Sequence, residues 1–341
     1  MRVAARFRFG TLRGIALQEL TCYVTLDGPE DDVLGFGVSI SRHRSGDIKD
    51  ISSPCEPLSR AAWGENGIRE SSYRQKLDSW MPLYFNSEHM HRAETILREA
   101  LASIATGSSR PSEYKPEHAL LVLPKLLNSM IVDLARGDAG AKSLRLLNGF
   151  CQIHRLFLHL LDTDAALRDL VECRLRNFIL DGATAKNECP NLGEWLVLLA
   201  VSDSFSWEEA SGRYLDESAA RNVRWYGRDH PQLIATTSTD GLALVSDKQR
   251  CATVFDATRV SRGLLCFSIF FLQNVARPAG RSLAQVARDL DRRMGQPAPE
   301  CLARLQDAAR RIDKIASWEQ YYAWIGCPAP SSESELAATL R

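Results

Sequence analysis

Three residues in the middle of the chain carry side chains that could do chemistry, namely Cys151, His154 and His159. Cys151 and His154 are three residues apart, so on a helix they share one face, whereas His159 falls beside that face. Such a pair could ligate a metal or form a cysteine–histidine dyad, but a metal needs further ligands and a dyad needs an oxyanion site. The sequence completes neither arrangement. The rest of the stripe is leucine, at Leu144, Leu147, Leu158 and Leu161. We therefore interpret Cys151 and His154 as core residues, with catalysis as the alternative.

Other sequence motifs that bind cofactors or metals are absent. The nine cysteines are scattered without a CxxC pair, which argues against a local zinc or thioredoxin-type site. The nucleophile elbow, the Walker A motif and HExxH are also missing. Gly35-Phe36-Gly37 lies inside an alternating strand pattern and is no phosphate loop. His89 and His91 are interpreted as a solvated helix start rather than a metal site. The sequence thus predicts no cofactor and no metal.

Aromatic residues gather in two places, where they either pack on the core or form a partner surface. Trp80 and Tyr84 belong to a proline-interrupted segment, and Tyr321, Tyr322 and Trp324 lie close to the end of the chain. Aromatic rings mostly provide buried area, and a terminal segment stays ordered when it is tied down. Burial is the favoured interpretation, and the five residues are kept as a candidate partner surface.

Composition excludes several classes of function. Lys+Arg and Asp+Glu both number 42, so no global field attracts nucleic acid or an anionic membrane. The run Leu264–Leu272 is too short for a membrane span, which needs about 20 apolar residues. An odd number of cysteines without a secretory signal favours a reducing, cytoplasmic location. The N-terminal alternation Val3, Ala5, Phe7, Phe9 favours a strand over a mitochondrial presequence.

The elements that would position these residues are mainly helical. Residues 117–161 predict two apolar helices joined by a turn at 136–140, and Ser87 is expected to cap an earlier helix to Ile104. Six further helices are predicted: Ala165–Leu180, Leu192–Val201, Ser206–Asp229, Lys248–Ala276, Ser282–Met294 and Glu300–Ser317. A capping-box pattern begins at Ser206, and another at Ser332 opens a last short helix. Period-two alternation predicts strands at 18–26 and 34–40, with a return strand at Ile48–Ile51.

The predicted fold is therefore mainly α, a multi-helix bundle or irregular α-solenoid with a small N-terminal antiparallel β-hairpin or sheet. Residues 1–52 form a small β element packed on the body, because so few strands are not stable alone. Residues 53–116 form an irregular aromatic-rich segment and one helix. Residues 117–341 form the main helical body.

Six blocks of the sequence together resemble a known helical region. They are VLGFGVSISR (33–42), WMPLYFNSEH (80–89), LLVLPKLLNSMIV (120–132), NGFCQIHRLFLHLL (148–161), NLGEWLVLLAVSD (191–203) and ATRVSRGLLCFSIFFL (257–272). They resemble the C-terminal helical region of multidomain ubiquitin-conjugating-type proteins of protists and algae, over most of the chain. The resemblance implies a role in ubiquitin-related machinery. It carries over no catalytic residue, because the His-Pro-Asn element of a conjugating core is absent and Cys189-Pro190-Asn191 is not that arrangement.

We expect a non-enzymatic helical module that binds a protein partner, with ubiquitin or ubiquitin-conjugating machinery as the partner that the resemblance implies. One alternative is an enzyme centred on Cys151 and His154. A second alternative is a purely structural, oligomerising domain. Neither nucleic acid nor a membrane is expected as a partner.

Overall fold

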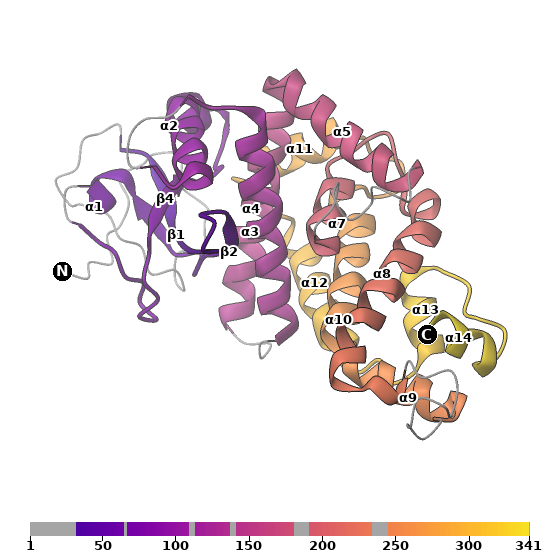
Figure 1. Cartoon of the computed structure of the whole chain (residues 1–341). Coiled ribbons are helices and arrows are strands. Elements are labelled where there is room, and N and C mark those ends of the chain that lie inside the picture. The colour runs from indigo at the N-terminus through magenta and orange to yellow at the C-terminus, as the bar shows by residue number, and fades with distance from the viewer. Residues whose placement is uncertain are drawn as a thin grey trace.

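The computed structural model describes residues 32–64, 67–108, 113–136, 141–180, 191–233 and 245–340. Within these ranges the chain is mainly helical and carries a small antiparallel sheet near its N-terminus, which confirms the predicted fold class (Figure 1). The predicted strands at 3–9 and 18–26, the turn at 137–140 and the N-terminal presequence alternative lie outside the described residues.

The sheet is built around β1 (Leu34–Arg42), which pairs with three short antiparallel strands: β2 (Ile48–Ser52), β3 (Pro57–Ser59) and β4 (Ser79–Pro82). The hairpin of β1 and β2 confirms the alternation read from the sequence. The prediction of an irregular segment from residue 53 onward is wrong for β3 and β4, which pair with both edges of β1 at Gly35. Strands of three and four residues are too short to show a period of two, and their pairing with β1 defines them.

Two helices accompany the sheet, α1 (Arg60–Gly64) and α2 (Ser87–Thr106). The side chain of Asn86 caps α2 by accepting from the N–H of His89, so the cap lies one residue before the predicted Ser87. Gly107 ends the helix with a φ of 69°, in the left-handed region that glycine adopts readily. Helix α2 contacts β4 and the first of the two central helices.

The predicted central pair is present as α3 (Pro116–Arg136) and α4 (Ala141–Thr163). Helix α3 continues through Pro124 and contacts β2, α2, α4, α5, α7 and α10. Its segment Pro116–Ala135 is long and apolar enough to cross a membrane by length and composition, and 67% of that window is buried inside the structure. These contacts on several sides account for the apolar composition of α3, because a helix that packs on several neighbours buries most of its surface.

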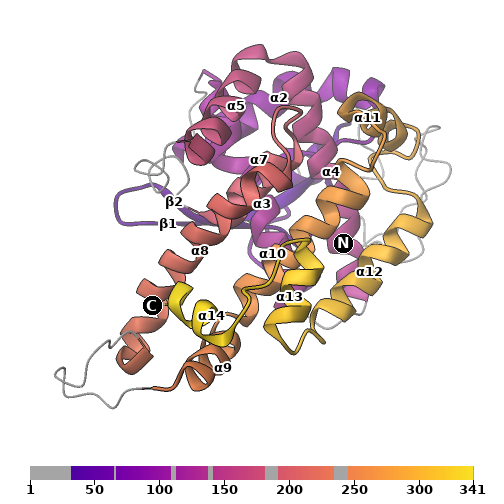
Figure 2. The same ribbon diagram turned by 90° about the vertical axis from the view of Figure 1, so that its right-hand side faces the viewer.

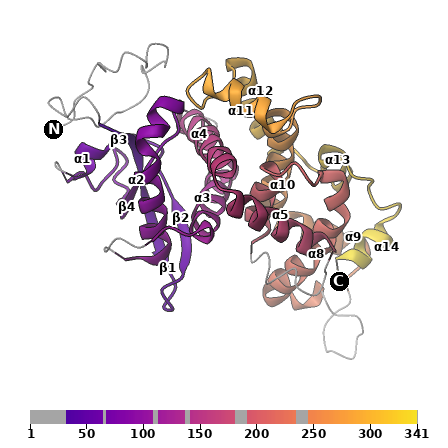
Figure 3. The same ribbon diagram turned by 90° about the horizontal axis from the view of Figure 1, so that it is seen from above.

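The remaining helices lie on the side of α3 and α4 away from the sheet (Figures 2 and 3). They are α5 (Ala165–Leu180), α7 (Leu192–Ala200), α8 (Trp207–Asp229), the 3₁₀ turn η2 (Pro231–Leu233), α9 (Asp247–Ala257), α10 (Arg259–Phe271), the π-helix η4 (Leu272–Ala276), α11 (Leu283–Asp291), α12 (Pro299–Ile312), α13 (Trp318–Ile325) and α14 (Glu333–Thr339). Ser206 and Ser282 each form a complete capping box. Ser332 caps α14.

One of the predicted helices is divided in the structure, and another is shorter than predicted. The helix predicted over 248–276 breaks at Thr258, which ends α9 and begins α10, and the helix predicted to Ser317 ends at Ile312, before a separate α13. The Thr258 hydroxyl donates to the Val254 carbonyl at 2.7 Å, a bond that competes with continuous helix geometry. The sequence pattern missed the break because both pieces carry apolar residues with helical periodicity.

One hydrophobic cluster joins the sheet to the helical body. It contains Phe36 of β1, Leu127 of α3 and Phe271 of α10, so the described sheet packs on the helices. A second, smaller cluster joins Tyr226 of α8, Val254 of α9 and Leu336 of α14. Figure 2 shows α9 and α14 side by side at this end of the molecule, in agreement with their contacts.

Candidate functional site

Cys151 and His154 lie in the core of the molecule, on α4. Cys151 is 0% exposed and His154 is 1% exposed. The His154 ring meets Phe271 edge-on, with ring centroids 5.1 Å apart. Burial raises the pKa of the Cys151 thiol, and burial followed by the charge of Arg155 lowers the pKa of His154 to about 3. Both groups are therefore neutral near pH 7, whereas a cysteine nucleophile must be a thiolate.

No group of three or more histidine, cysteine, aspartate or glutamate side chains in the part of the chain that the structure describes could hold a metal ion. His89 is not the solvated residue that its position at a helix start predicts. It is buried, and its Nε2 accepts a hydrogen bond from the N–H of Leu34 at 3.1 Å. His89 thus joins α2 to the start of β1.

We expect iodoacetamide to distinguish exposed from buried cysteine thiols in the native protein. Cys173 is exposed on α5 and should be carboxamidomethylated rapidly, whereas buried Cys151 and Cys266 should stay unmodified until the protein is denatured. Peptide mass spectrometry over a labelling time course measures both rates in one sample, with Cys173 as the internal control. Labelling of Cys151 as fast as that of Cys173 would contradict its assignment to the core and revive the catalytic alternative.

His159 and Tyr84 belong to a polar junction between the front of the molecule and α11. Arg155 binds Asp291 through two hydrogen bonds of 2.7 and 3.1 Å and donates a third, at 3.0 Å, to the hydroxyl of Tyr84. The His159 ring lies 5.8 Å from that of Tyr84, and its Nε2 is 3.9 Å from a carboxylate oxygen of Glu94. These contacts hold α4, α11 and the segment after β4 together.

The five aromatic residues predicted as a candidate partner surface do not lie together. Trp80 and Tyr84 are buried in the front of the molecule, where the Trp80 indole donates to the Leu58 carbonyl at 2.8 Å. Tyr321 is buried on α13, and Tyr322 and Trp324 keep part of their surface exposed. The Trp324 indole donates to the Cys266 carbonyl at 3.0 Å, which fixes α13 to α10.

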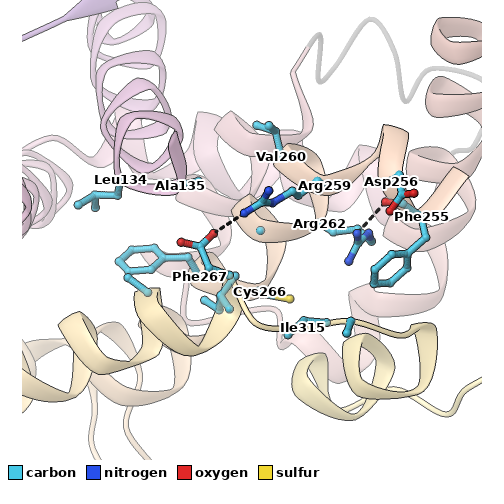
Figure 4. Close-up of a pocket in the computed structure, with 15 residues that line it drawn as sticks. Leu134, Ala135, Phe255, Asp256, Arg259, Val260, Arg262, Cys266, Phe267 and Ile315 are labelled. Atoms are coloured by element: carbon cyan, nitrogen blue, oxygen red, sulfur yellow. Dashed lines mark hydrogen bonds and ion pairs between the residues drawn. The ribbon is translucent and has the colours of Figure 1, made fainter. Parts of the chain in front are cut away.

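A groove between the end of α3, α10 and α12 is a better candidate for a binding site. We call it the α10 groove and define it by Leu134, Phe255, Val260, Arg262, Phe267 and Ile312. Its volume is about 600 Å³, within the usual range for ligand pockets. Figure 4 shows lining side chains of α3, α9 and α10 around this space, together with Ile315 of the connection after α12. The walls combine apolar side chains with the charged side chains of Asp256, Arg259, Arg262 and Asp313.

Arg262 is the unusual residue of the α10 groove, because it is 7% exposed but forms no ion pair with any described carboxylate. Its guanidinium donates to the Phe255 carbonyl at 2.7 Å and to the Thr258 hydroxyl at 3.3 Å, and lies 3.3 Å from the centroid of the Phe255 ring (Figure 4). Burial lowers the pKa of Arg262 to about 10, so the group remains charged at neutral pH. Asp256 also lines the groove, and its charge acts on Arg262 without forming an ion pair. A buried cation without an ion pair is costly, and an anionic ligand would offset that cost.

The mouth of the groove combines an ion pair with an exposed apolar side chain. Arg259 and Asp313 lie 3.6 Å apart across the mouth, both well exposed, and Val260 is 41% exposed beside them. An exposed pair of this kind contributes little to stability, so it could open for a ligand at small cost. The groove can therefore accept an apolar segment that presents a carboxylate to Arg262.

Sequence reasoning missed this site because it treated 248–276 as one core helix. The break at Thr258 turns Phe255 back over Arg262, and only a folded chain places α12 beside them. The fold places this protein in the mainly α-helical class, with a small antiparallel sheet. No protein-family model matches the chain, and no curated protein matches it. The geometry of the groove is therefore the main support for a functional proposal.

Proposed function

We propose that this protein is a non-enzymatic helical protein-interaction module that binds an apolar, carboxylate-bearing segment of a partner protein in the α10 groove. The observation that carries the proposal is Arg262, a buried cation that lines the groove and forms no ion pair with a described carboxylate. An arginine fork matches a carboxylate through two hydrogen bonds, which supplies specificity as well as attraction.

Apolar side chains of the partner would supply most of the affinity. Each valine- or leucine-sized side chain that becomes fully buried contributes about 1.5–3 kcal/mol. Leu134, Val260 and Ile312 provide the complementary walls from three different helices. Recognition of a partner segment by a groove between helices is a common mode for helical proteins.

We further propose that the partner belongs to the ubiquitin-conjugation machinery, either ubiquitin itself or a conjugating enzyme, in the cytoplasm. The support is the resemblance of six sequence blocks, of which 257–272 spans α10 and so forms the floor of the groove. The role is accessory to conjugation, because the chain carries no conjugating active-site element.

The proposal is tested by binding to immobilised ubiquitin and to a panel of ubiquitin-conjugating enzymes. Val260→Asp places a charge on the apolar rim of the groove, and we expect it to weaken binding by about tenfold or more. Leu121→Asp is the matched control, since Leu121 is an exposed apolar residue of α3 that does not line the groove. Biolayer interferometry gives both affinities.

Two results would contradict the proposal at different points. Equal binding by Val260→Asp and Leu121→Asp would remove the α10 groove as the docking site. Absence of binding to ubiquitin and to every conjugating enzyme tested would remove the proposed class of partner.

A further inference from the structure

A second cavity, at the other end of α12, has a different chemistry. It lies between the π-helix η4, α11 and the start of α12. Figure 3 shows α11 and α12 at one corner of the molecule. We call it the arginine pocket and define it by Val275, Arg281, Val286, Leu290, Arg292 and Arg293. Its volume is about 620 Å³. It shares no residue with the α10 groove.

The rim of the arginine pocket is positively charged. Asp289 forms ion pairs with Arg281 and, at 3.1 Å, with Arg292, and so holds both guanidinium groups at the rim. Arg293 is exposed and has no ion pair or side-chain hydrogen bond to any described residue. The lining residues include three arginines and one aspartate, so their formal charge is +2.

The floor of the pocket is apolar and is shaped by an irregular backbone. Val275, Val286 and Leu290 are buried beneath the rim. Val275 belongs to the π-helix η4, a backbone form that occurs often at functional sites. In the same π-helix, the Asn274 amide donates to the Phe270 carbonyl at 2.8 Å and accepts a hydrogen bond from Arg304, which fixes this wall.

Further hydrogen-bond donors face the same space. The side-chain amide of Gln296 lines the pocket and has no hydrogen bond to a described residue. Helix α12 begins at the pocket with Pro299 after Ala298, and no side chain caps its N-terminus. The positive end of the α12 dipole therefore adds to the field of the arginines. Glu300 on the same turn is exposed and does not line the pocket.

We propose that the arginine pocket binds a small organic phosphate, with the phosphate on Arg281, Arg292 and Arg293 and the organic part over Val275, Val286 and Leu290. A phosphate monoester carries about −1.5 to −2 charges near pH 7, which matches the formal charge of the lining, whereas a carboxylate carries one. Guanidinium groups bind phosphate oxygens through paired hydrogen bonds. The apolar floor requires an apolar body, so inorganic phosphate fills only part of the site.

The experiment is isothermal titration calorimetry of the full chain at low ionic strength with phenyl phosphate, inorganic phosphate and benzoate. Phenyl phosphate should bind most tightly, because inorganic phosphate lacks the ring and benzoate lacks the second charge. Arg293→Gln should weaken phenyl phosphate binding by about tenfold, as expected for the loss of a charge-assisted hydrogen bond.

Arg288→Gln is the matched control, because Arg288 is an exposed arginine of α11 that does not line the pocket. If Arg288→Gln and Arg293→Gln weaken phenyl phosphate binding equally, the ligand responds only to the general positive charge of the protein, and the proposed site is wrong. No heat with phenyl phosphate would overturn it as well.

Co-sedimentation with phosphatidylcholine vesicles that contain phosphatidic acid separates the two sources of a phosphate group. Binding to these vesicles without binding to phenyl phosphate would overturn a soluble ligand in favour of a lipid headgroup.

Discussion

We expect Gly35→Ala to destabilise the protein by about 3 kcal/mol, near the upper end of the usual cost of adding a group to a packed core. Gly35 lies on β1, where β3 and β4 approach from the two edges. A β-carbon there would overlap the carbonyl oxygen of Met81 and the indole of Trp80. The carbonyl belongs to the paired backbone of β4, so the clash is relieved only if β1 and β4 move apart. Equilibrium unfolding in urea, followed by tryptophan fluorescence and by circular dichroism, measures the loss.

Gly212→Ala is the control for this substitution because it adds the same methyl group in open space. Gly212 lies inside α8, and nothing lies within 4 Å of an added β-carbon. Alanine should stabilise that helix by about 0.5–1 kcal/mol. The same chemical change should therefore have opposite signs at the two positions. A Gly35→Ala protein as stable as the unsubstituted chain would contradict the close approach of β4 to β1.

The glycines of β1 show how far local pattern predicts this fold. Alternation of Leu34, Phe36, Val38 and Ile40 with small residues predicts a strand and excludes a phosphate loop, and the structure confirms the strand. The reason for glycine at position 35 is the approach of the Trp80 ring and the β4 backbone. That contact joins residues more than forty positions apart, so no local window contains it. The long periodic helices α3 and α4 could be predicted because their signal is local.

The candidate site was less predictable than the fold for the same physical reason. Leucine periodicity around Cys151 and His154 predicts burial, and both residues are buried. The α10 groove depends instead on the break at Thr258 and on the placement of α12 beside α10. Arg262 itself looks like an ordinary helix-surface arginine in the sequence. Its burial results from the Phe255 ring and the α9 carbonyl that lie against it.

Acidification should destabilise the protein through its buried histidines before most carboxylates are protonated. Burial, followed by the charge of Arg92, lowers the pKa of His89 to about 4, and burial, followed by that of Arg155, lowers the pKa of His154 to about 3. The unfolded chain binds a proton at each histidine with a pKa of about 6.5. Below that pH the unfolded state binds more protons than the folded state, so the free energy of unfolding falls as the pH is lowered.

The size of this effect follows from the two pKa values. From pH 7 to pH 5 each of these histidines should remove about 2 kcal/mol from the free energy of unfolding, and the loss ends near the folded pKa. Protonation of His89 would also break its hydrogen bond from the N–H of Leu34, because an imidazolium nitrogen cannot accept. Urea unfolding curves at several pH values between 7 and 5 measure the slope directly.

Substitution of one buried histidine measures how much that residue contributes to the fall in the free energy of unfolding with pH. In His154→Leu, the side chain beside Phe271 no longer titrates, so the loss between pH 7 and pH 5 should be smaller by about 2 kcal/mol. Comparing slopes rather than absolute stabilities separates the proton from any repacking, since a packing defect shifts the whole curve equally. His91→Gln is the matched control, because His91 is exposed on the same helix as His89. If His154→Leu and His91→Gln change the slope equally, His154 is accessible to protons in the folded protein, and its place in the core is wrong.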